Sequence, residues 1–311
     1  MRYAEKKKIR HPVFYVLACR IGPAARVVRR RIDAMGGQLY VNPDGHEFLR
    51  AKWNALIRRY WKYSERLMVK HAGLLVCDSR NMETYIREEY AAYDPKTVFI
   101  AYGAETSPSV LADDDPKLTA WYQKHQLQKD GYYLVVGRFV PENNYETMIR
   151  EFMASSTAKA FALITDVSGD FMEKLKQRTG FDRDPRIRFV GTVYDKELLK
   201  KIREHAYGYF HGHEVGGTNP SLLEALASTR LNLLLDVGFN REVADGSALY
   251  WTKETGNLAA LIDRADGMSA DERIALGGRA RERIEQYYSW EYITDRYEQI
   301  FSKRSKTCVE S

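Results

Sequence analysis

Cysteine, proline and long apolar runs are all scarce in this sequence. Its three cysteines, Cys19, Cys77 and Cys308, are too widely spaced for a disulfide framework or a Cys-x-x-Cys metal site. No run approaches the roughly 20 apolar residues of a membrane span, and no apolar signal core follows the charged N-terminus. With 9 prolines and 44% hydrophobic residues among 311, disorder is disfavoured and one or two full cores are expected. These features fit a protein of a reducing, cytoplasmic compartment, soluble or peripheral to a membrane.

The basic character of the chain is concentrated in its front part. Residues 1–70 hold 17 Lys and Arg against 5 Asp and Glu, a net charge of +12, whereas the whole chain carries +6. The remaining 241 residues therefore carry 6 − 12 = −6. A basic face suits a polyanion or an anionic lipid surface, and an ordinary solvated surface is the alternative.

From residue 131 onward, short β-branched or aromatic runs alternate with helical patterns, as in parallel βαβ units. This alternation predicts a complete Rossmann-like sheet. The predicted strands are Tyr132–Phe139, Ala160–Asp166, Ile187–Val193, Ala206–His211, Leu231–Val237 and Ala248–Trp251. The predicted helices are Asn144–Ala154, Phe171–Thr179, Asp195–Glu204, Asn219–Ser228 and Leu258–Arg264.

The front half shows the same alternation with fewer elements. We therefore expect an N-terminal Rossmann-like domain over 1–110, a linker over 111–130, a C-terminal domain over 131–285, and a helix over 286–311 that crosses back to the first domain. The predicted front elements are the strands Val13–Cys19, Gln38–Asn42, Leu74–Asp78 and Val98–Tyr102 and the helix Trp53–Val69, and the predicted C-terminal helix is Tyr288–Phe301.

The strongest local signal is HGHEVGGTNPSLLEALA at residues 211–227, which follows a predicted strand and opens a predicted helix. Asn219 is a good N-cap and Pro220 suits the first helical position. A helix that begins in this way offers N–H groups and a partial positive charge to a diphosphate. Glu224 lies just over one turn inside, within reach of a ribose or sugar. An ordinary capped helix with Glu224 facing solvent is the alternative.

A second signal, GRFVPENNYETMI at residues 137–149, again combines strand, loop and helix. Arg138 stands at the carboxyl end of its strand, the edge where open α/β sheets bind ligands. A guanidinium there can hold a leaving diphosphate through two hydrogen bonds. A structural arginine at a strand end is the alternative, but a second such loop in the same sheet favours a binding role.

These motifs resemble the GT-B glycosyltransferases of family 4, which bind nucleotide sugars through GR(x)nK and a pair of glutamates eight residues apart. A narrower resemblance, over nearly the whole chain, is to streptococcal-type rhamnosyltransferases that build capsular or rhamnan cell-wall polysaccharides. It is carried by HPVFYVLACRIGP, GGQLYVNPDGHEFLRAKW, CDSRNMETYI, VVGRFVPENNYETMIREF, FHGHEVGGTNPSLLEAL and LLLDVGFNREV. The resemblance implies two Rossmann-like domains facing across a cleft.

It also implies a retaining transfer of L-rhamnose from dTDP-L-rhamnose to glucose or N-acetylglucosamine on a polyprenyl diphosphate carrier. By the same resemblance, catalytic roles fall on Arg138, Glu224, Glu214 and His46. The implied donor-binding residues are Arg138, Asn143, Gly191, Thr192, Val193, Tyr194, Gly216, Gly217, Thr218, Asn219 and Glu224, and the acceptor-side residues are Asp44, His46 and Glu47. For His46, an ordinary surface position is the alternative.

The sequence departs from the family at three places. Asn143 stands where the family has lysine, so another cation or backbone N–H groups must meet part of the diphosphate charge. Eight positions before Glu224 stands Gly216, and the nearest acid is Glu214. The first strand and Gly-rich loop of the family have no counterpart, so we expect a shortened N-terminal domain.

No metal or other cofactor is expected beside the sugar-nucleotide substrate. The Asp-x-Asp pattern Asp113–Asp115 falls in the predicted linker and is interpreted as a solvated turn. In the retaining chemistry that the resemblance implies, the departing phosphate itself accepts the acceptor's proton.

The predicted helix from Trp53 bears on the location of the protein. Its main apolar stripe, with Trp53, Leu56, Tyr60, Leu67 and Met68, is expected to be core. Trp61 and Tyr63 lie beside basic residues, a combination that favours a membrane interface. We therefore expect peripheral binding at the inner face of the cell membrane and no nucleic-acid partner, because no nucleic-acid-binding pattern is present.

Two alternatives to a rhamnosyltransferase remain open at this stage. A shortened chain could bind a nucleotide or a partner without catalysis, and a GT-B enzyme could transfer another hexose. The residues alone do not define the acceptor, the linkage or the oligomeric state.

Overall fold

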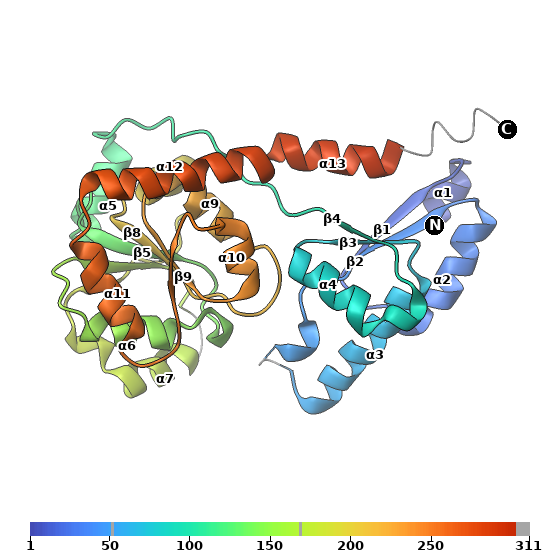
Figure 1. The fold of residues 1–311 in the computed structure, drawn as a ribbon, viewed down its shortest axis with the longest axis horizontal. Coiled ribbons are helices and arrows are strands. Elements are labelled where there is room, and N and C mark those ends of the chain that lie inside the picture. The colour runs from blue at the N-terminus through green and yellow to red at the C-terminus, as the bar shows by residue number, and fades with distance from the viewer. Residues whose placement is uncertain (51–52, 168–169, 303–311) are drawn as a thin grey trace. The chain divides into compact units, whose positions relative to one another are not determined.

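The computed structural model describes residues 1–50, 53–167 and 170–302. The chain forms two compact units, each built on a parallel sheet. Unit 1 comprises Met1–Tyr102, Val215–Thr218 and Glu291–Ser311, and unit 2 comprises Gly103–Glu214 and Asn219–Trp290. The predicted α/β class is confirmed (Figure 1). Cys308 lies outside the described residues.

Unit 1 has a four-stranded parallel sheet in the order β1-β2-β3-β4. Its core joins the sheet to the helices through buried side chains such as Ile32, Val41 and Met68. The strands are β1 (Val13–Leu17), β2 (Gln38–Asn42), β3 (Leu74–Cys77) and β4 (Thr97–Phe99). The helices are α1 (Arg2–Lys6), α2 (Gly22–Ala34), α3 (Ala55–His71), α4 (Arg80–Glu89) and α13 (Trp290–Ser302), with 3-10 turns at Glu47–Leu49 and Ala91–Tyr93.

Unit 2 has a six-stranded parallel sheet in the order β10-β9-β8-β5-β6-β7. The chain runs outward from β5 in one direction and from β8 in the other, so these adjacent strands form the topological switch point of the sheet. The strands are β5 (Tyr132–Val136), β6 (Ala160–Ile164), β7 (Ile187–Phe189), β8 (Gly208–His211), β9 (Asn232–Leu235) and β10 (Leu249–Trp251). The helices are α5 (Pro116–His125), α6 (Tyr145–Ala154), α7 (Asp170–Thr179), α8 (Lys196–Glu204), α9 (Pro220–Ser228), α10 (Gly238–Ala244), α11 (Asn257–Asp266) and α12 (Ala270–Tyr287), with 3-10 turns at Pro141–Asn143 and Phe181–Arg183.

Both faces of the unit 2 sheet are covered. Successive side chains of a strand point to opposite faces, and those of β5 divide accordingly. Tyr133 and Val135 pack with one buried cluster, and Tyr132 and Leu134 pack with the other. The near-continuous apolar strands of this half thus follow from burial on two faces.

The sequence analysis did not predict several of the helices. The sequence analysis predicted a single helix in the front half, where the structure also has α1, α2 and α4. In α2, four arginines hide a narrow apolar face on which Ala25 and Ile32 are fully buried. Helix α12 contains Gly277 and Gly278, which weaken helix propensity. A Cβ atom at Gly277 would lie 2.6 Å from Arg230 Cα, so close packing requires glycine there.

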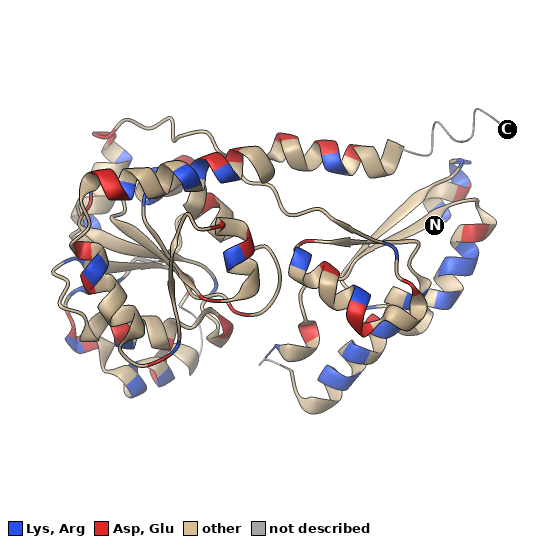
Figure 2. Ribbon diagram, in the orientation of Figure 1, with Lys and Arg blue, Asp and Glu red and all other residues tan. Residues whose placement is uncertain are grey.

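The predicted apolar stripe of α3 is only partly core. Met68 is fully buried, but 76% of Leu56 and 44% of Tyr60 are exposed. Tyr63, with 49% exposed, lies among the arginines of the same helix. Lysine and arginine residues follow one another along α2 and α3 (Figure 2). The apolar and basic side chains of α3 therefore share an exposed surface.

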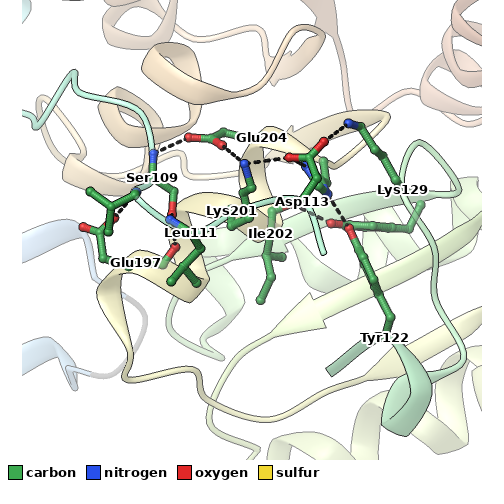
Figure 3. Close-up of polar contacts among 12 residues, drawn as sticks. Ser109, Leu111, Asp113, Tyr122, Lys129, Glu197, Lys201, Ile202 and Glu204 are labelled. Carbon is green, nitrogen blue, oxygen red and sulfur yellow. Dashed lines mark hydrogen bonds and ion pairs between the residues drawn. The ribbon is translucent and has the colours of Figure 1, made fainter. Parts of the chain in front are cut away.

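Residues 111–130, predicted as a linker, contain α5 and belong to unit 2. Asp115 caps this helix by accepting a hydrogen bond from Lys117 N at 2.8 Å, and Leu118 and Trp121 enter the core. Asp113 and Asp114 lie in an exposed turn, which confirms the interpretation of a solvated turn for these two residues, but Asp113 also makes ion pairs. Its carboxylate pairs with Lys129 at 2.6 Å and with Lys201 at 2.8 Å (Figure 3).

The imidazole of His205 completes this network. Burial lowers the pKa of His205, so the ring is neutral at pH 7. Its Nε2–H then donates to Asp113 at 3.0 Å, and its Nδ1 accepts from the Tyr122 hydroxyl at 2.9 Å. Nearby, Glu204 accepts from the backbone N–H of Ser109 at 2.6 Å (Figure 3). These contacts fasten the segment before α5 to α8.

We expect Asp113→Asn to destabilise unit 2. Hydrogen bonds from Lys129, Lys201 and His205 hold the pKa of Asp113 below its ordinary value of 3.8. The carboxylate is 57% exposed, so solvent screening limits the loss to about 1 kcal/mol, or roughly 2–4 °C in melting temperature. Because the folded pKa is depressed, this contribution is present above pH 3.8 and disappears as pH falls through the lower pKa. Thermal unfolding of Asp113→Asn and of the exposed control Asp114→Asn checks this; equal melting temperatures would contradict it.

Candidate functional site

A pocket of about 290 Å³ lies at the switch point of the unit 2 sheet, at the carboxyl ends of β5 and β8. Ligands of open α/β sheets bind at this place because the loops diverge there. Three chain segments form the pocket: the loop after β5, the end of β8 with the loop that follows it, and the first residues of α9. Its lining residues are Val135, Val136, Gly137, Arg138, Asn143, Tyr145, His211, Gly212, His213, Asn219, Pro220 and Ser221.

The loops after β5 and β8 are tied together by asparagine side chains. Asn144 donates a hydrogen bond from Nδ2 to Gly212 O at 2.8 Å, and the Asn143 Oδ1 lies 2.8 Å from His213 Nδ1. A Cβ atom at Gly212 would lie 2.4 Å from Asn143 O, so only glycine permits this approach. The loops after β5 and β8 are therefore packed directly against each other.

Asn143 also fixes the loop that carries Arg138. Its Nδ2 donates to Arg138 O at 2.7 Å, which leaves Oδ1 as the acceptor for His213 Nδ1–H. The proton of His213 on this side is therefore on Nδ1. Thus Asn143 carries no charge to the pocket and instead positions its neighbours.

Arg138 follows β5 and Gly137, and its side chain is exposed at the pocket. Within the described part of the chain, its guanidinium makes no hydrogen bond or ion pair. Arg186 of the same unit, by contrast, is paired with Asp184 at 2.7 Å. Arg138 therefore offers an uncompensated positive charge at the pocket.

The first turn of α9 lies on the same pocket and is fixed by hydrogen bonds. Asn219 caps it by accepting from Ser221 N at 2.9 Å. The Ser221 hydroxyl donates to Val136 O at 2.8 Å and lies 2.8 Å from the Tyr209 hydroxyl. These contacts join the helix N-terminus to the ends of β5 and β8. The partial positive charge of the helix end is thereby held beside Arg138.

Glu224 does not line this pocket. It lies on α9 and pairs through Oε2 with Arg203 of α8 at 2.6 Å. The Arg203 side chain is 4% exposed and that of Glu224 is 44% exposed. Glu214 likewise pairs with Lys253 at 2.5 Å. In the structure, both predicted catalytic glutamates are thus engaged with cations of unit 2.

The other predicted donor-binding residues lie elsewhere. Residues 191–194 (Gly191, Thr192, Val193 and Tyr194) follow β7, where Gly191 has φ +75° and Tyr194 is 89% exposed. Gly216, Gly217 and Thr218 belong to unit 1 by their contacts. The pocket therefore brings together only three of the predicted donor-binding residues: Arg138, Asn143 and Asn219.

The predicted acceptor-side residues belong to unit 1. Asp44 has φ +60° and its Oδ1 accepts from Gly45 N at 2.8 Å. Glu47 pairs with Arg50. His46 lies between Phe48 and Tyr85, with ring centroids 5.6 Å and 4.4 Å away, and burial lowers its pKa. His46 is therefore a neutral, partly buried imidazole in an aromatic environment.

The sequence analysis missed His211 and His213 as pocket residues. His211 is the last residue of β8 and is 4% exposed, and His213 is 9% exposed. Their position at the carboxyl end of an apolar strand is the same signal that identified Arg138. Among the described residues, no group of three or more His, Cys, Asp or Glu side chains could hold a metal ion.

Comparison with solved structures shows that the chain has the GT-B fold. It is similar to sucrose-phosphate synthase from Thermosynechococcus elongatus, with a TM-score of 0.77 and 18% identity over 98% of this chain and 76% of that one. It is also similar to HepE from Anabaena in complex with UDP, with a TM-score of 0.73 and 14% identity over 97% and 80% of the two chains. For α,α-trehalose 6-phosphate synthase from Burkholderia multivorans, the TM-score is 0.74 and the identity 11% over 96% and 72%.

Similarity in sequence to a known family is found in the front part of the chain. Residues 1–105 match the family described as "Domain of unknown function (DUF1972)". No curated protein is similar to the chain in sequence. At identities below 20%, the structural similarity defines the fold and leaves the activity to be argued from the site.

We expect Glu224→Gln to destabilise the protein through Arg203. The substitution leaves an almost fully buried guanidinium without its carboxylate, which costs about 1–3 kcal/mol. Chemical denaturation of Glu224→Gln, Arg203→Gln and the double variant measures the coupling. If the pair is structural, the double variant loses less stability than the sum of the single variants. Strict additivity would contradict the ion pair.

Proposed function

We propose that this protein is a nucleotide-sugar-dependent glycosyltransferase. The observation that carries the proposal is the meeting of the unpaired Arg138 guanidinium and the α9 N-terminus on one pocket at the switch point of unit 2. Both groups suit a diphosphate, the part that nucleotide sugars have in common. The similar HepE structures contain UDP or UDP-glucose, which supports a nucleoside diphosphate as ligand.

In this proposal, the pocket stabilises the leaving nucleoside diphosphate. Negative charge grows on the diphosphate as the bond to the sugar breaks. Arg138 can meet two oxygens at once, and the α9 dipole is already oriented at the site. Asn143 keeps the Arg138 loop in place through the 2.7 Å hydrogen bond to the Arg138 carbonyl oxygen. Preorganised donors of this kind lower the barrier because they need not reorient during the reaction.

For the donor we propose dTDP-L-rhamnose, transferred with retention to glucose or N-acetylglucosamine on a polyprenyl diphosphate in bacterial surface polysaccharide synthesis. This finer assignment rests on the sequence resemblance, and another hexose is the alternative. Asp44, His46 and Glu47 remain the proposed acceptor-side residues. A neutral His46 beside Phe48 and Tyr85 supports contact with an uncharged sugar, because aromatic rings pack against the apolar faces of sugars.

A non-catalytic nucleotide-binding module is a second candidate. It is favoured by Asn143 in place of lysine and by the ion pairs of Glu224 and Glu214. Binding measured together with transfer distinguishes the two candidates. A chain that binds dTDP but transfers no rhamnose to a polyprenyl-linked sugar would support the module.

We further propose that unit 1 binds the inner face of the cell membrane, where a lipid-linked acceptor is found. The support comes from α3, on which exposed Leu56, Tyr60 and Tyr63 accompany exposed Arg58 and Arg59. Apolar and aromatic side chains flanked by arginines suit the interface of an anionic bilayer. No helix among the described residues combines the length and the apolar character of a membrane span.

We expect Arg138→Ala to weaken dTDP and UDP binding at least tenfold, about 1.4 kcal/mol. The same substitution should lower turnover at least tenfold, because the diphosphate charge grows in the transition state. Titration calorimetry measures binding, and a donor screen that includes dTDP-L-rhamnose measures transfer. Arg183→Ala, another exposed arginine of unit 2, is the matched control. Unchanged binding and turnover in Arg138→Ala would contradict the proposed site.

We expect the double substitution Arg58→Gln and Arg59→Gln to weaken binding to vesicles that contain anionic lipid. Each charge near the surface is worth about 1 kcal/mol, so the combined loss is roughly 30-fold. Cosedimentation at low and high salt measures this loss, which should shrink as salt screens the charges. The control is the pair Lys174→Gln and Arg183→Gln, exposed cations of unit 2. An equal loss in both pairs would contradict a specific role for α3.

A further inference from the structure

His211 lies on the wall of the switch-point pocket, at the carboxyl end of β8. It shares this pocket with Arg138 and with Ser221 of the α9 N-terminus. Only 4% of the residue is exposed. The imidazole is therefore almost entirely enclosed by protein, at the carboxyl edge of the sheet, where ligands of open α/β sheets bind.

The Nε2 atom of His211 is buried and has no hydrogen-bond partner within the described residues. The two other buried histidines of unit 2 differ in this respect. His205 contacts Asp113 and Tyr122 through its two ring nitrogens, and His213 contacts Asn143. Because buried polar atoms almost always have partners, an orphan on a pocket wall indicates a partner that comes from the pocket.

The charge of His211 decides which kind of contact it can make. Burial, together with the neighbouring His213, lowers the pKa of His211 to about 3. The ring is therefore neutral at pH 7 and offers one N–H and one lone pair. It cannot replace the missing lysine as a counter-charge, but it can donate a directed hydrogen bond.

We propose that His211 is a ligand-binding residue of this pocket, whose Nε2–H donates a hydrogen bond to an oxygen of a bound nucleoside diphosphate. This inference rests on the proposed function and extends it, since the pocket then holds the diphosphate through a guanidinium, a helix N-terminus and a neutral imidazole. Of these three groups, only the imidazole makes a directional hydrogen bond without adding positive charge to the pocket. It therefore distinguishes a correctly seated diphosphate from other anions.

The test is the substitution His211→Leu, which removes the orphan polar atom and keeps an apolar side chain. We expect its melting temperature to be no lower than that of the wild type, because no hydrogen bond of the free protein is lost. We expect its affinity for dTDP and for UDP to fall at least tenfold, about 1.4 kcal/mol. His211→Gln, which retains a donor, should keep more affinity than His211→Leu.

His205→Leu is the matched control, because His205 is equally buried at 4% exposed and lies outside the pocket. It should lose stability, since two hydrogen bonds disappear, and keep the wild-type affinity for dTDP. We thus expect His211→Leu to lose affinity but not stability, and His205→Leu to lose stability but not affinity.

In the wild type, nitrogen chemical shifts from labelled histidine should show a protonated His211 Nε2 that shifts on addition of dTDP. If the wild type binds dTDP and His211→Leu binds it with the same affinity, this inference is overturned and the proposed function stands. A strongly destabilised His211→Leu together with an unmoved Nε2 signal would also overturn it, because the imidazole would then be structural. If the wild type binds neither dTDP, UDP nor inorganic pyrophosphate, the proposed function fails, and this inference fails with it.

Discussion

The contact between the loops after β5 and β8 is the constraint on which the site depends. Two adjacent asparagines, Asn143 and Asn144, bridge to the main chain and side chains of residues 212–213. Gly212 allows the backbones to approach closely enough for both bridges. Without these two bridges, the loop that carries Arg138 would be held less firmly to the loop after β8, to which the Glu214 N–H also binds by donating to Glu142 O at 3.1 Å. Asn143 thus contributes a rigid frame to the pocket and no positive charge.

The polar and charged side chains of unit 2 discussed above fall into two groups. Asp113, Glu214 and Glu224 are engaged with lysines or with Arg203, and these contacts fasten loops and helices to one another. Arg138 and His211 have no such partners among the described residues. Groups that satisfy one another stabilise a fold, whereas groups left unsatisfied beside a cavity are available to something that enters it. This division supports a ligand pocket more strongly than any single residue does.

The fold was largely accessible from the sequence, and the site only in part. Strands such as Tyr132–Val136 are buried on both faces and therefore stand out as apolar runs bounded by turns. Helix α2 was missed because its arginines mask the apolar face. Helix α12 was missed because it contains Gly277, which is required by close packing against Arg230, a residue far away in the sequence. Arg138 and Asn219 were found because strand ends and helix caps are local signals. The partner of Glu224 could not be found, because Arg203 lies 21 positions away on another helix.

Helix α13 packs against strands that lie near the start of the sequence. Tyr297 and Phe301 of α13 pack against Tyr15 of β1, and Phe301 stacks on Tyr40 of β2 at a centroid distance of 5.9 Å. Residues 103–290 separate these partners along the chain. At ribosomal rates of 5–20 residues per second, synthesis from Tyr15 or Tyr40 to Phe301 takes roughly 13–57 seconds, during which these side chains of β1 and β2 lack their α13 partners. The nascent sheet thus leaves these aromatic side chains without their α13 partners while unit 2 is still being made, and surface exposed in this way is a target for chaperones.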